Sequence, residues 1–486
     1  MSEQEPGWQR LDPRMMLVNP ITDFAKFVPT VIPLLIAGTV AGAQGWQFAA
    51  LALPAVWGLL RYLTTTYRVS ADRVELRRGL LNRRVLTVPL DRVRTVDLTA
   101  SLVRRLLGLS TVKIGTGTAS TDDDQQLDLD SLPTERAREL RRVLLEGRET
   151  PVAPGAGTEP AGPSAGPPAV VRFRPAWLLY APFTAGGLAI AGAVVGTASQ
   201  FVEQVHIDTS AAGLPGHGTW VAVVAVGLVG FLLVVLLLSV VAYAAAYWGL
   251  TLTHSPGSPW HLRRGLLTTQ ETSIDEERMA GVVVGEPLLL RCVRGARLSA
   301  IVTGLRSGSV LVPPAPAEES RRAATAVLGD RGAVDGPLRP HGPRARTRRY
   351  TRALWPAGLL TVAALVAARV TDLGWLAWPV PLVLVGAALL AGDRARALGH
   401  ARVGRLLVAR SGSLARRRSV LDTGHLIGWT LQDSWWQRRA GLVTAVATTA
   451  GGGQKVTVPD VPSGDAVALA YATTPELVAQ FLADPR

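Results

Sequence analysis

Apolar residues along the chain follow two recurring patterns, long uninterrupted runs and short alternating stretches. Pairs of long runs lie within residues 25–63, 173–248 and 351–392, and a membrane-spanning helix needs about 20 predominantly apolar residues. Each pair is followed by short stretches with an apolar residue at every second position, which is typical of half-buried strands. The pattern therefore predicts three transmembrane hairpins, each followed by a small β-rich domain.

The first alternating region, residues 67–116, contains turn and cap signals. Gly79, between basic and apolar residues, predicts a tight turn between two strands because glycine accepts a positive φ. Residues 101–107 have helical spacing, and Gly108 can end that helix in the left-handed region. A strand over residues 126–130, with Leu127 and Leu129 on one face, and a helix beginning at residues 133–135 complete the unit.

This region resembles the bacterial pleckstrin-homology-like domain of the YdbS/YdbT-like membrane proteins. The resemblance is carried by Tyr67-Arg68-Val69, Arg78-Gly79-Leu80-Leu81, Val88-Pro89-Leu90-Asp91-Arg92-Val93 and Leu106-Leu107-Gly108-Leu109 followed by Thr111-Val112. It implies a small β-barrel or sandwich closed by a C-terminal helix, with no catalytic site. It also implies a role that in some members is associated with envelope stress or resistance to membrane-active peptides.

The same signals return twice. Residues 262–267 repeat residues 76–81, and residues 288–295 echo 102–108. A third copy has Gly412 in the turn and Ser434–Leu442 in place of the helix, and Thr474-Pro475-Glu476 predicts its final helix, with proline at the first helical position. The two marker glycines are nearly equally spaced in the copies, at 79 and 108, 265 and 295, and 412 and 441, which predicts three related units.

We therefore predict a polytopic α-helical membrane protein with three α+β pleckstrin-homology-like domains. The predicted segments are an N-terminal segment (1–24), hairpin 1 (25–63), domain 1 (64–146), a Pro/Gly/Ala linker (147–172), hairpin 2 (173–248), domain 2 (249–328), a basic linker (329–350), hairpin 3 (351–392) and domain 3 (393–486). Hairpin 3 is short and Ala-rich, so a topology with four spans is the alternative to six.

Charge predicts the orientation. The net charge is +14, and the loops proposed to lie outside, residues 44–45, 199–219 and 370–374, contain no Lys or Arg. Because Lys and Arg stay in the cytoplasm, both termini and all three domains are expected there, in the plasma membrane. Tryptophans near span ends, including Trp177 and Trp355, fit the interfacial belt.

Basic residues beside apolar ones form the candidate site. We predict contact with anionic headgroups of the inner leaflet through residues of two short helical segments, namely Arg104, Arg105, Trp435, Trp436, Arg438 and Arg439. The basic run 416–418 and the pairs 77–78, 83–84 and 263–264 belong to the same basic pattern. The alternative is a solvated charged face over a packed apolar stripe.

Other chemistry has weaker signals. Asp122, Asp123 and Asp124 lack the glycine and glutamate that a calcium loop needs at its sixth and twelfth positions. No hydrolase elbow, phosphate loop or zinc motif is present, and Cys292 is the single cysteine. We therefore predict no cofactor and no metal. The dispersed basic residues include no recognition helix, so nucleic acid is not a predicted partner.

The functional hypothesis is a non-enzymatic membrane protein that binds inner-leaflet lipid or partner proteins, one candidate partner being another membrane protein of the same family. The alternative is a regulatory or structural component of a membrane transport complex. A membrane enzyme would need a convergent acid/base or metal set, which the sequence does not supply.

Overall fold

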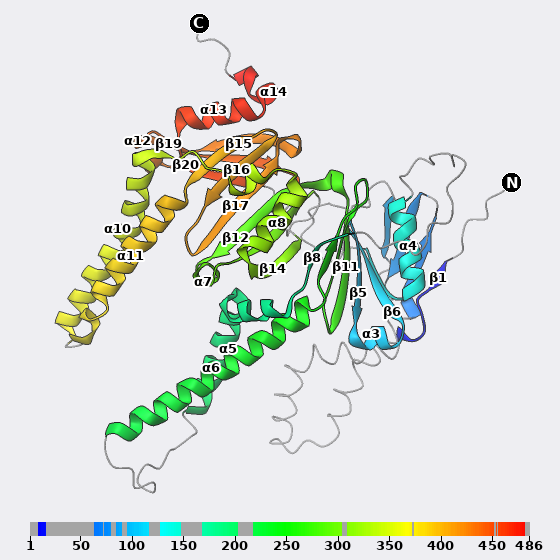
Figure 1. Cartoon of the computed structure of the whole chain (residues 1–486), viewed down its shortest axis with the longest axis horizontal. Coiled ribbons are helices and arrows are strands. Elements are labelled where there is room, and N and C mark those ends of the chain that lie inside the picture. Colours follow the sequence, from blue (N-terminus) through cyan, green and yellow to red (C-terminus); the bar gives the residue numbers. More distant parts are fainter. Residues whose placement is uncertain are drawn as a thin grey trace, which may run out of the picture. The chain divides into compact units, whose positions relative to one another are not determined.

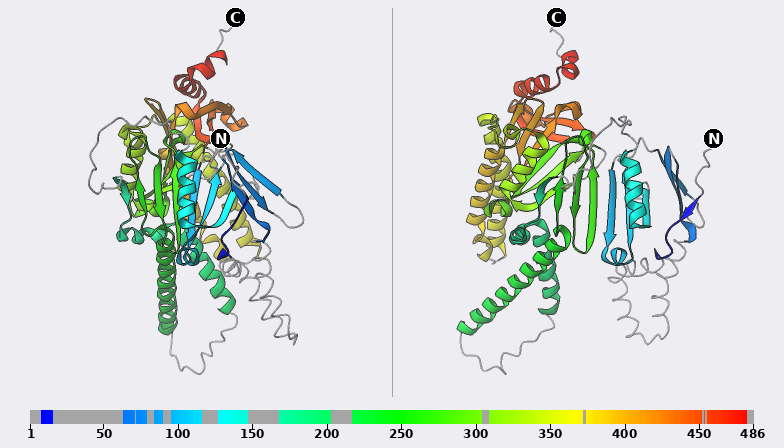
Figure 2. Two further views of the ribbon diagram at one scale, coloured as in Figure 1. Left: turned by 90° about the vertical axis from the view of Figure 1, so that its right-hand side faces the viewer. Right: turned by 45° about the vertical axis from the view of Figure 1, so that its right-hand side comes forward.

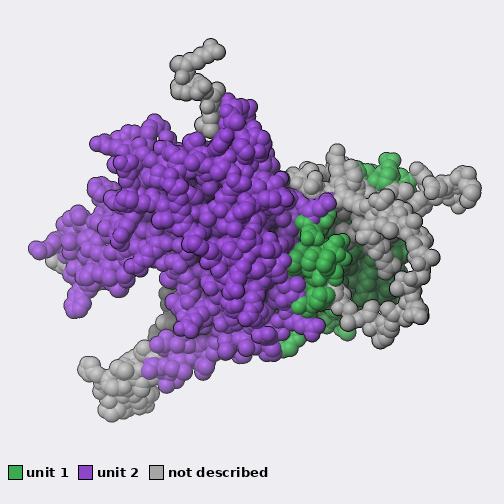
Figure 3. Space-filling view, turned by 45° about the horizontal axis from the view of Figure 1, so that its top comes forward, with its two compact units in different colours: residues 1–169, 245–276 green, residues 170–244, 277–486 purple. Residues whose placement is uncertain are grey.

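The computed structural model describes residues 8–15, 63–70, 72–78, 84–89, 95–115, 127–146, 168–202, 217–303, 309–371, 374–451, 453 and 455–481. The first predicted hairpin, the turn at Gly79, the acidic run 122–124 and most of the linker 147–172 lie outside these residues. The chain divides into two compact units, one of residues 1–169 and 245–276 and the other of residues 170–244 and 277–486 (Figure 3). Each unit is described by itself below.

Unit 1 contains two antiparallel sheets. The first has the order β1 (Gln9–Arg10), β2 (Thr66–Val69), β3 (Arg73–Arg78), β4 (Arg84–Pro89). The second runs in the order β7 (Leu127–Pro133), β6 (Leu109–Gly115), β5 (Thr95–Ser101), β11 (Thr268–Ile274), β10 (Trp260–Arg264), β9 (Thr251–Thr253). The short helix α3 (Leu102–Leu106) follows β5, and α4 (Thr134–Glu146) follows β7 (Figure 1).

Local signals in unit 1 form as the sequence predicts. The Ser101 side chain accepts a hydrogen bond from the backbone N–H of Arg104 and so caps α3. Gly108 has φ +71°, the left-handed conformation that ends this helix. Leu127 and Leu129 are fully buried on one face of β7, which confirms the alternation predicted there.

Unit 2 repeats these elements around two further sheets. One sheet has the order β14 (Val310–Pro316), β13 (Gly295–Val302), β12 (Met279–Pro287), β17 (Ala415–Asp422), β16 (Leu406–Ser411), β15 (Gly399–Val403). The other has the order β18 (Leu426–Gln432), β19 (Leu442–Thr449), β20 (Lys455–Pro462). The helices that belong to them are α7 (Leu288–Cys292), α8 (Ala317–Leu328), α9 (Arg331–Asp335), α12 (Trp435–Arg439) and α13 (Ser463–Thr473).

The element order therefore recurs three times. We call each recurrence a copy: its first half has three strands, and its second half has a strand, a short helix, two strands and a longer helix. Copy 1 consists of β2–β4 and β5–α4, copy 2 of β9–β11 and β12–α8, and copy 3 of β15–β17 and β18–α13. In all three, the last two strands of the second half shift register in the same place, between Ser110 and Val112, Ala296 and Leu298, and Val443 and Ala445.

One marker of the repeat is corrected by the structure. The left-handed residue after the short helix is Gly108 in copy 1, Arg294 in copy 2 and Gly441 in copy 3, with φ of +71°, +54° and +65°. Arg294, and not Gly295, is therefore the equivalent position. Counted this way, each left-handed residue follows its turn glycine, Gly79, Gly265 or Gly412, at the same sequence distance.

In copies 1 and 3 the two halves pack face to face. In copy 1, Leu76 and Val88 of the first half share one core with Leu98 and Ile114 of the second. In copy 3, Leu407 and Leu421 share a core with Ala445, Val458 and Leu469. These cores make sandwiches of the kind that the resemblance implies, each covered by the helix after its last strand.

Two described helices are long and apolar enough to cross a membrane, α6 (His217–Tyr247), through its segment Ala225–Tyr247, and α10 (Gly342–Val370). A third candidate is the bent pair η3 (Pro175–Phe183) and α5 (Ala185–Val202), with an angle of 57° between them. Helix α11 (Val380–Ala397) runs back beside α10 (Figures 1 and 2). The third predicted hairpin is thus present as two helices, and its first helix passes the length and composition test.

Three details of the prediction are wrong. Trp177 is only 1% exposed and packs edge-on against Phe173 at 5.9 Å, so it belongs to a protein core and not to an interfacial belt. Residues 329–350, expected to be a linker, contain α9 and the first turns of α10. Copy 3 is closed by α13, whereas the helix predicted from residue 474 is the short α14 (Pro475–Val478) after it.

Candidate functional site

The base of the α10–α11 hairpin is where the chain changes from basic to apolar. Five arginines lie in the first turns of α10, namely Arg344, Arg346, Arg348, Arg349 and Arg352. Leu354 then begins an apolar stretch that extends to Ala368. Such a boundary belongs at a membrane surface, because Arg side chains remain at the headgroups while the apolar residues enter the bilayer.

A buried carboxylate fixes the first turns of α10 to copy 3. Asp460, in β20, has a side chain 3% exposed and takes up a left-handed conformation, with φ +56°. Its Oδ1 accepts from Arg348 and from the Gln437 amide of α12, both at 2.8 Å, and its Oδ2 forms an ion pair with Arg349 at 2.7 Å. One acid therefore holds two arginines of the helix base and positions α12 beside them.

A second carboxylate fixes α11. Asp393 accepts two hydrogen bonds from Arg291 of α7, at 3.2 and 3.0 Å, and one from Arg416 of β17. Arg418 in turn donates to the backbone oxygens of Ala333 and Gly336. Arg416 and Arg418 are thus committed to contacts within the protein, which corrects their inclusion in the predicted lipid-facing basic pattern.

Helix α12 presents aromatic and basic side chains to solvent. A capping box between Ser434 and Gln437 starts it, and Arg348 of α10 donates to the Ser434 hydroxyl at 3.3 Å. Trp435 and Trp436 are 58% and 69% exposed and meet edge to face, with ring centroids 4.6 Å apart. An apolar pair of this size on a five-residue helix is unusual at a surface facing only water.

The two arginines of α12 differ. Arg438 pairs with Asp433 at 2.9 Å, and this hydrogen bond lowers the pKa of the Asp433 carboxyl. Arg439 lies over the Trp435 ring, 5.5 Å from its centroid, in a cation–π contact. Arg439 has no carboxylate partner among the described residues, so it is the better placed of the two for an external anion.

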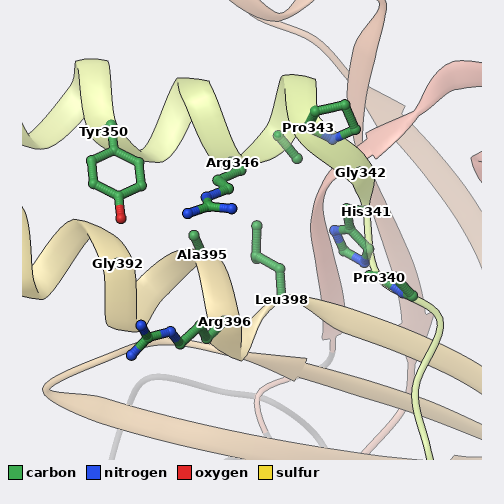
Figure 4. Close-up of a pocket in the computed structure, with 11 residues that line it drawn as sticks. Pro340, His341, Gly342, Pro343, Arg346, Tyr350, Gly392, Ala395, Arg396 and Leu398 are labelled. Atoms are coloured by element: carbon green, nitrogen blue, oxygen red, sulfur yellow. The ribbon is translucent and has the colours of Figure 1, made fainter.

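A pocket of about 570 Å³ lies between the bases of α10 and α11. Its walls include Arg346 and Tyr350 of α10, Arg396 of α11, and Leu398 (Figure 4). Tyr350 points from α10 toward Gly392 of α11, where a side chain larger than hydrogen would crowd the phenol oxygen. No carboxylate lines this pocket, and neither Arg346 nor Arg396 has an ion-pair partner in the part of the chain that the structure describes.

Helix geometry places the pocket and α12 at the same level. Arg346 and Arg348 are two residues apart, so they lie about 3 Å apart along α10 and on nearly opposite sides of it. Arg346 faces the pocket, and Arg348 faces Asp460 and Ser434 beside α12. The first residue of the apolar stretch, Leu354, is about 12 Å further along the helix. The exposed cations and tryptophans therefore flank the helix base on both sides.

Two buried histidines pair at the pocket, and one of them, His341, lines it. His341 is held between the carbonyl oxygen of Pro459 and the ring of His400, with nitrogen contacts of 3.0 Å to each. Burial, together with the neighbouring His400, lowers the pKa of His341 to about 4, and burial also lowers the pKa of His400. Both rings are neutral at pH 7, which suits a structural role better than that of an anion-binding cation.

The other predicted residues lie on α3 in unit 1. Arg105 donates to the backbone oxygen of Leu266 and to the Thr269 hydroxyl, at 3.4 and 3.3 Å. The Arg104 Nε is buried. Leu106 is exposed beside them. The structure thus separates the predicted set into α3 and α12, and it gives only α12 a pair of exposed aromatic rings.

The equivalent helix in copy 2 is built differently. Leu290 of α7 is buried, Arg291 is bound by Asp393, and Tyr180 packs close to Gly295 just after the helix. The described residues contain no group of three or more His, Cys, Asp or Glu side chains that could hold a metal ion. What the arrangement around α10 offers is donors and cations for an anionic group, with an apolar surface next to them.

The sequence matches the bacterial PH domain family over residues 26–148 and 357–474. The chain belongs to this family. Each match begins within a predicted apolar hairpin and ends one or two residues after a second-half helix, so the unit that the family recognises is the hairpin together with its sandwich. No curated protein and no solved structure matches the chain.

Sequence reasoning missed three residues of this PH-domain site. Arg346 and Arg396 lie 50 positions apart and meet at one pocket only because α10 and α11 pack side by side. Asp460 lies 112 positions after Arg348. The available signal was the cluster of arginines immediately before the apolar stretch of the third hairpin, a pattern that is typical of residues at headgroup level.

Proposed function

We propose that this bacterial PH domain protein is a non-catalytic, multi-pass membrane protein that presents three PH-like domains at the cytoplasmic face and binds anionic lipid headgroups there. The headgroup phosphate lies against Arg346 and Arg396 in the pocket, Arg439 contacts a neighbouring headgroup, and Trp435 and Trp436 enter the interface. The observation that carries the proposal is the set of exposed, carboxylate-free arginines and exposed tryptophans at one level of α10.

The energetics favour this arrangement. A basic side chain near an anionic membrane surface contributes about 1 kcal/mol, and the Arg346 and Arg396 guanidiniums carry directed donors as well. Tryptophan is favoured at the interface because its ring is apolar and its N–H can remain hydrated. The PH-like sandwich supplies the rigid support, since Asp460 ties both α10 and α12 to it.

The family supports a binding role for lipid or protein and no particular chemistry. The resemblance to YdbS/YdbT-like members implies a setting in envelope stress or resistance to membrane-active peptides, and we include that setting in the proposal. A surface that gathers anionic lipid next to the hairpins is compatible with it.

The proposal is tested by lipid-dependent stabilisation of the full chain in detergent. Phosphatidylglycerol is expected to raise the thermal unfolding temperature more than phosphatidylcholine does. In Arg346→Gln/Arg396→Gln, the affinity for phosphatidylglycerol should fall by about 30-fold, corresponding to about 2 kcal/mol for two cations. The matched control Arg322→Gln/Arg331→Gln removes the same charge from exposed arginines of α8 and α9 and should leave the affinity unchanged. If both double variants lose the same affinity for phosphatidylglycerol, net charge alone explains the loss and the proposed site is wrong.

A further inference from the structure

The copies are joined to one another edge to edge. In unit 1, β11 of copy 2 pairs antiparallel with β5 of copy 1 over seven residue pairs. In unit 2, β17 of copy 3 pairs antiparallel with β12 of copy 2, again over seven. Both junctions thus have the same composition. The last strand of one copy's first half lies beside the first strand in the second half of the copy before it.

Both junctions use one register. Thr268, three residues after Gly265, lies opposite Ser101, the residue before α3. Ala415, three residues after Gly412, lies opposite Pro287, the residue before α7. The turn glycine and the short helix therefore set the register of the junction, and the same rule can be applied to any other pair of such strands.

Two strands of these types have no such neighbour among the described residues. β4, the third strand of copy 1, pairs there only with β3, and β18, the first strand of the second half of copy 3, pairs only with β19. Both strands expose apolar side chains beside polar ones: Val85 is 53% exposed and Ile427 and Leu431 are 60% and 46% exposed, while Thr87, Thr430 and Gln432 are exposed as well. Soluble edges are usually protected by charge or proline, and β18 contains neither, so its exposed apolar residues indicate a partner.

We infer that β18 of one molecule pairs antiparallel with β4 of a second, identical molecule, in a head-to-tail contact that repeats the internal junctions. Val85 lies six residues after Gly79, just as Glu271 lies six residues after Gly265. Leu431 lies three residues before Ser434, just as Leu98 lies three residues before Ser101. Since Glu271 and Leu98 are opposite each other, Val85 and Leu431 are opposite each other too. The exposed Ile427 then meets Pro89 on the same face.

The surface beside β18 fits this occupant. A groove of about 480 Å³ is lined by Ile427, Trp429 and Leu431 of β18 and by Leu477 and Phe481 from the helical segments after β20. At the junction in unit 1, the corresponding helix α4 contacts the incoming strand, because Arg141 donates to Glu271 of β11 at 3.3 Å and also bonds Ser273. In the proposed contact, the side chain that enters the groove is Val85, which is apolar like its walls.

The internal junctions argue for a second chain as the partner. Each joins a second half to the first half of the following copy, and a second chain offers a first-half edge of this type in its β4. A contact of this kind is heterologous, with different surfaces on the two partners, so it can close a ring or extend a row of molecules. It does not depend on lipid binding.

The test is disulfide cross-linking of full-length chains in membranes, in a Cys292→Ser background. Chains with Val85→Cys and one tag are expressed together with chains carrying Leu431→Cys and a second tag. Opposed residues of antiparallel strands have Cα atoms about 4.5–5.5 Å apart, within the range that a disulfide spans. A mixed dimer carrying both tags is expected, and neither variant expressed alone should form one.

Matched variants decide the outcome. Leu86→Cys replaces Val85→Cys as the control, since it points to the other face of β4 and should give no mixed dimer. Ala100 and Thr269 lie opposite each other in β5 and β11, so Ala100→Cys/Thr269→Cys is the positive control for oxidation. Loss of its free thiols shows that the oxidation was effective. The inference is overturned if this control pair oxidises and no mixed dimer forms. It is also overturned if Val85→Cys/Leu431→Cys in one chain yields only an internal disulfide in a monomer.

Discussion

The short helices α7 and α12 occupy equivalent places in copies 2 and 3, and both lie in unit 2. α7 is held to the protein through two of its five residues, since Leu290 is buried and Arg291 is bound by Asp393 of α11. α12 is capped and anchored through Gln437, yet it exposes Trp435 and Trp436. The same short helix thus packs against the protein in copy 2 and presents an exposed surface in copy 3, because the side chains of the two helices differ.

The largest expected effect is on the anchor of α12. Asp460→Ala leaves Arg348 and Arg349 without their buried counter-charge, which should destabilise unit 2 by about 3–5 kcal/mol. Denaturant unfolding of the detergent-solubilised protein measures this loss. A change below about 1 kcal/mol would mean that solvent replaces the carboxylate and that Asp460 does not position α12.

The pH dependence of the same region is the next largest effect. His341 has a pKa of about 4 in the folded protein, below its ordinary value of 6.5, so the neutral ring is the form that the fold stabilises. Its contribution is complete above pH 6.5 and is lost as the pH falls toward 4, because the unfolded chain takes up the proton first. The loss should reach about 3 kcal/mol at most, at 1.36 kcal/mol per pKa unit. His341→Asn should flatten the curve of unfolding free energy against pH between 6.5 and 4, and a curve like that of the parent would contradict the assignment.

Breaking the anchor of α7 should have a smaller effect and should sharpen the contrast. Asp393→Ala removes the partner of Arg291 and Arg416 at a partly exposed position, for an expected loss of about 1.5–3 kcal/mol. Phosphatidylglycerol binding should be retained, since α7 is not part of the binding surface. If lipid binding falls as far as in Arg346→Gln/Arg396→Gln, the two helices do not differ in function.

The smallest effect on stability is expected for the exposed rings. Trp435→Ala/Trp436→Ala should change the free energy of unfolding by less than about 0.5 kcal/mol, because both side chains are on the surface. In bilayers it should weaken the docking of α12 by up to about 2 kcal/mol per ring. The position of the rings is measured in the parent protein as protection from a water-soluble tryptophan-modifying reagent, and Trp435→Ala/Trp436→Ala identifies their share of the signal. Leu289→Ala on α7 is the matched exposed-apolar control for the change in stability. Rings equally reactive in detergent and in bilayers would place α12 in water.

Local features of this fold were predictable, and long-range ones were not. The helical spacing of residues 101–107, Gly108 and the Leu127–Leu129 alternation each report on their own neighbours in the chain, so the short helix, its end and the strand face followed from sequence. β5 escaped notice although Val96 and Leu98 alternate there. The pairing of β5 with β11 joins segments about 170 residues apart, and no local pattern encodes it.

The candidate site divides in the same way. The residues of α12 were predicted because tryptophan and arginine adjoin in sequence, and their lipid contact stays a prediction. The pocket was missed because Arg346 and Arg396 meet only through the packing of two helices. Arg416 was misjudged for the same reason: its partner Asp393 lies on an element whose position the sequence does not reveal.

The central claim is that anionic headgroups lie at the base of the α10–α11 hairpin and beside α12. The most direct measurement is photo-cross-linking of the full-length protein in bilayers that contain a phosphatidylglycerol with a reactive headgroup, followed by peptide mapping. The account predicts labelling of residues 340–350, 392–398 and 435–439, with little on residues 288–292 of α7, and competition by unlabelled phosphatidylglycerol. Labelling of α7 as strong as that of α12, or labelling that phosphatidylcholine displaces equally well, would contradict it.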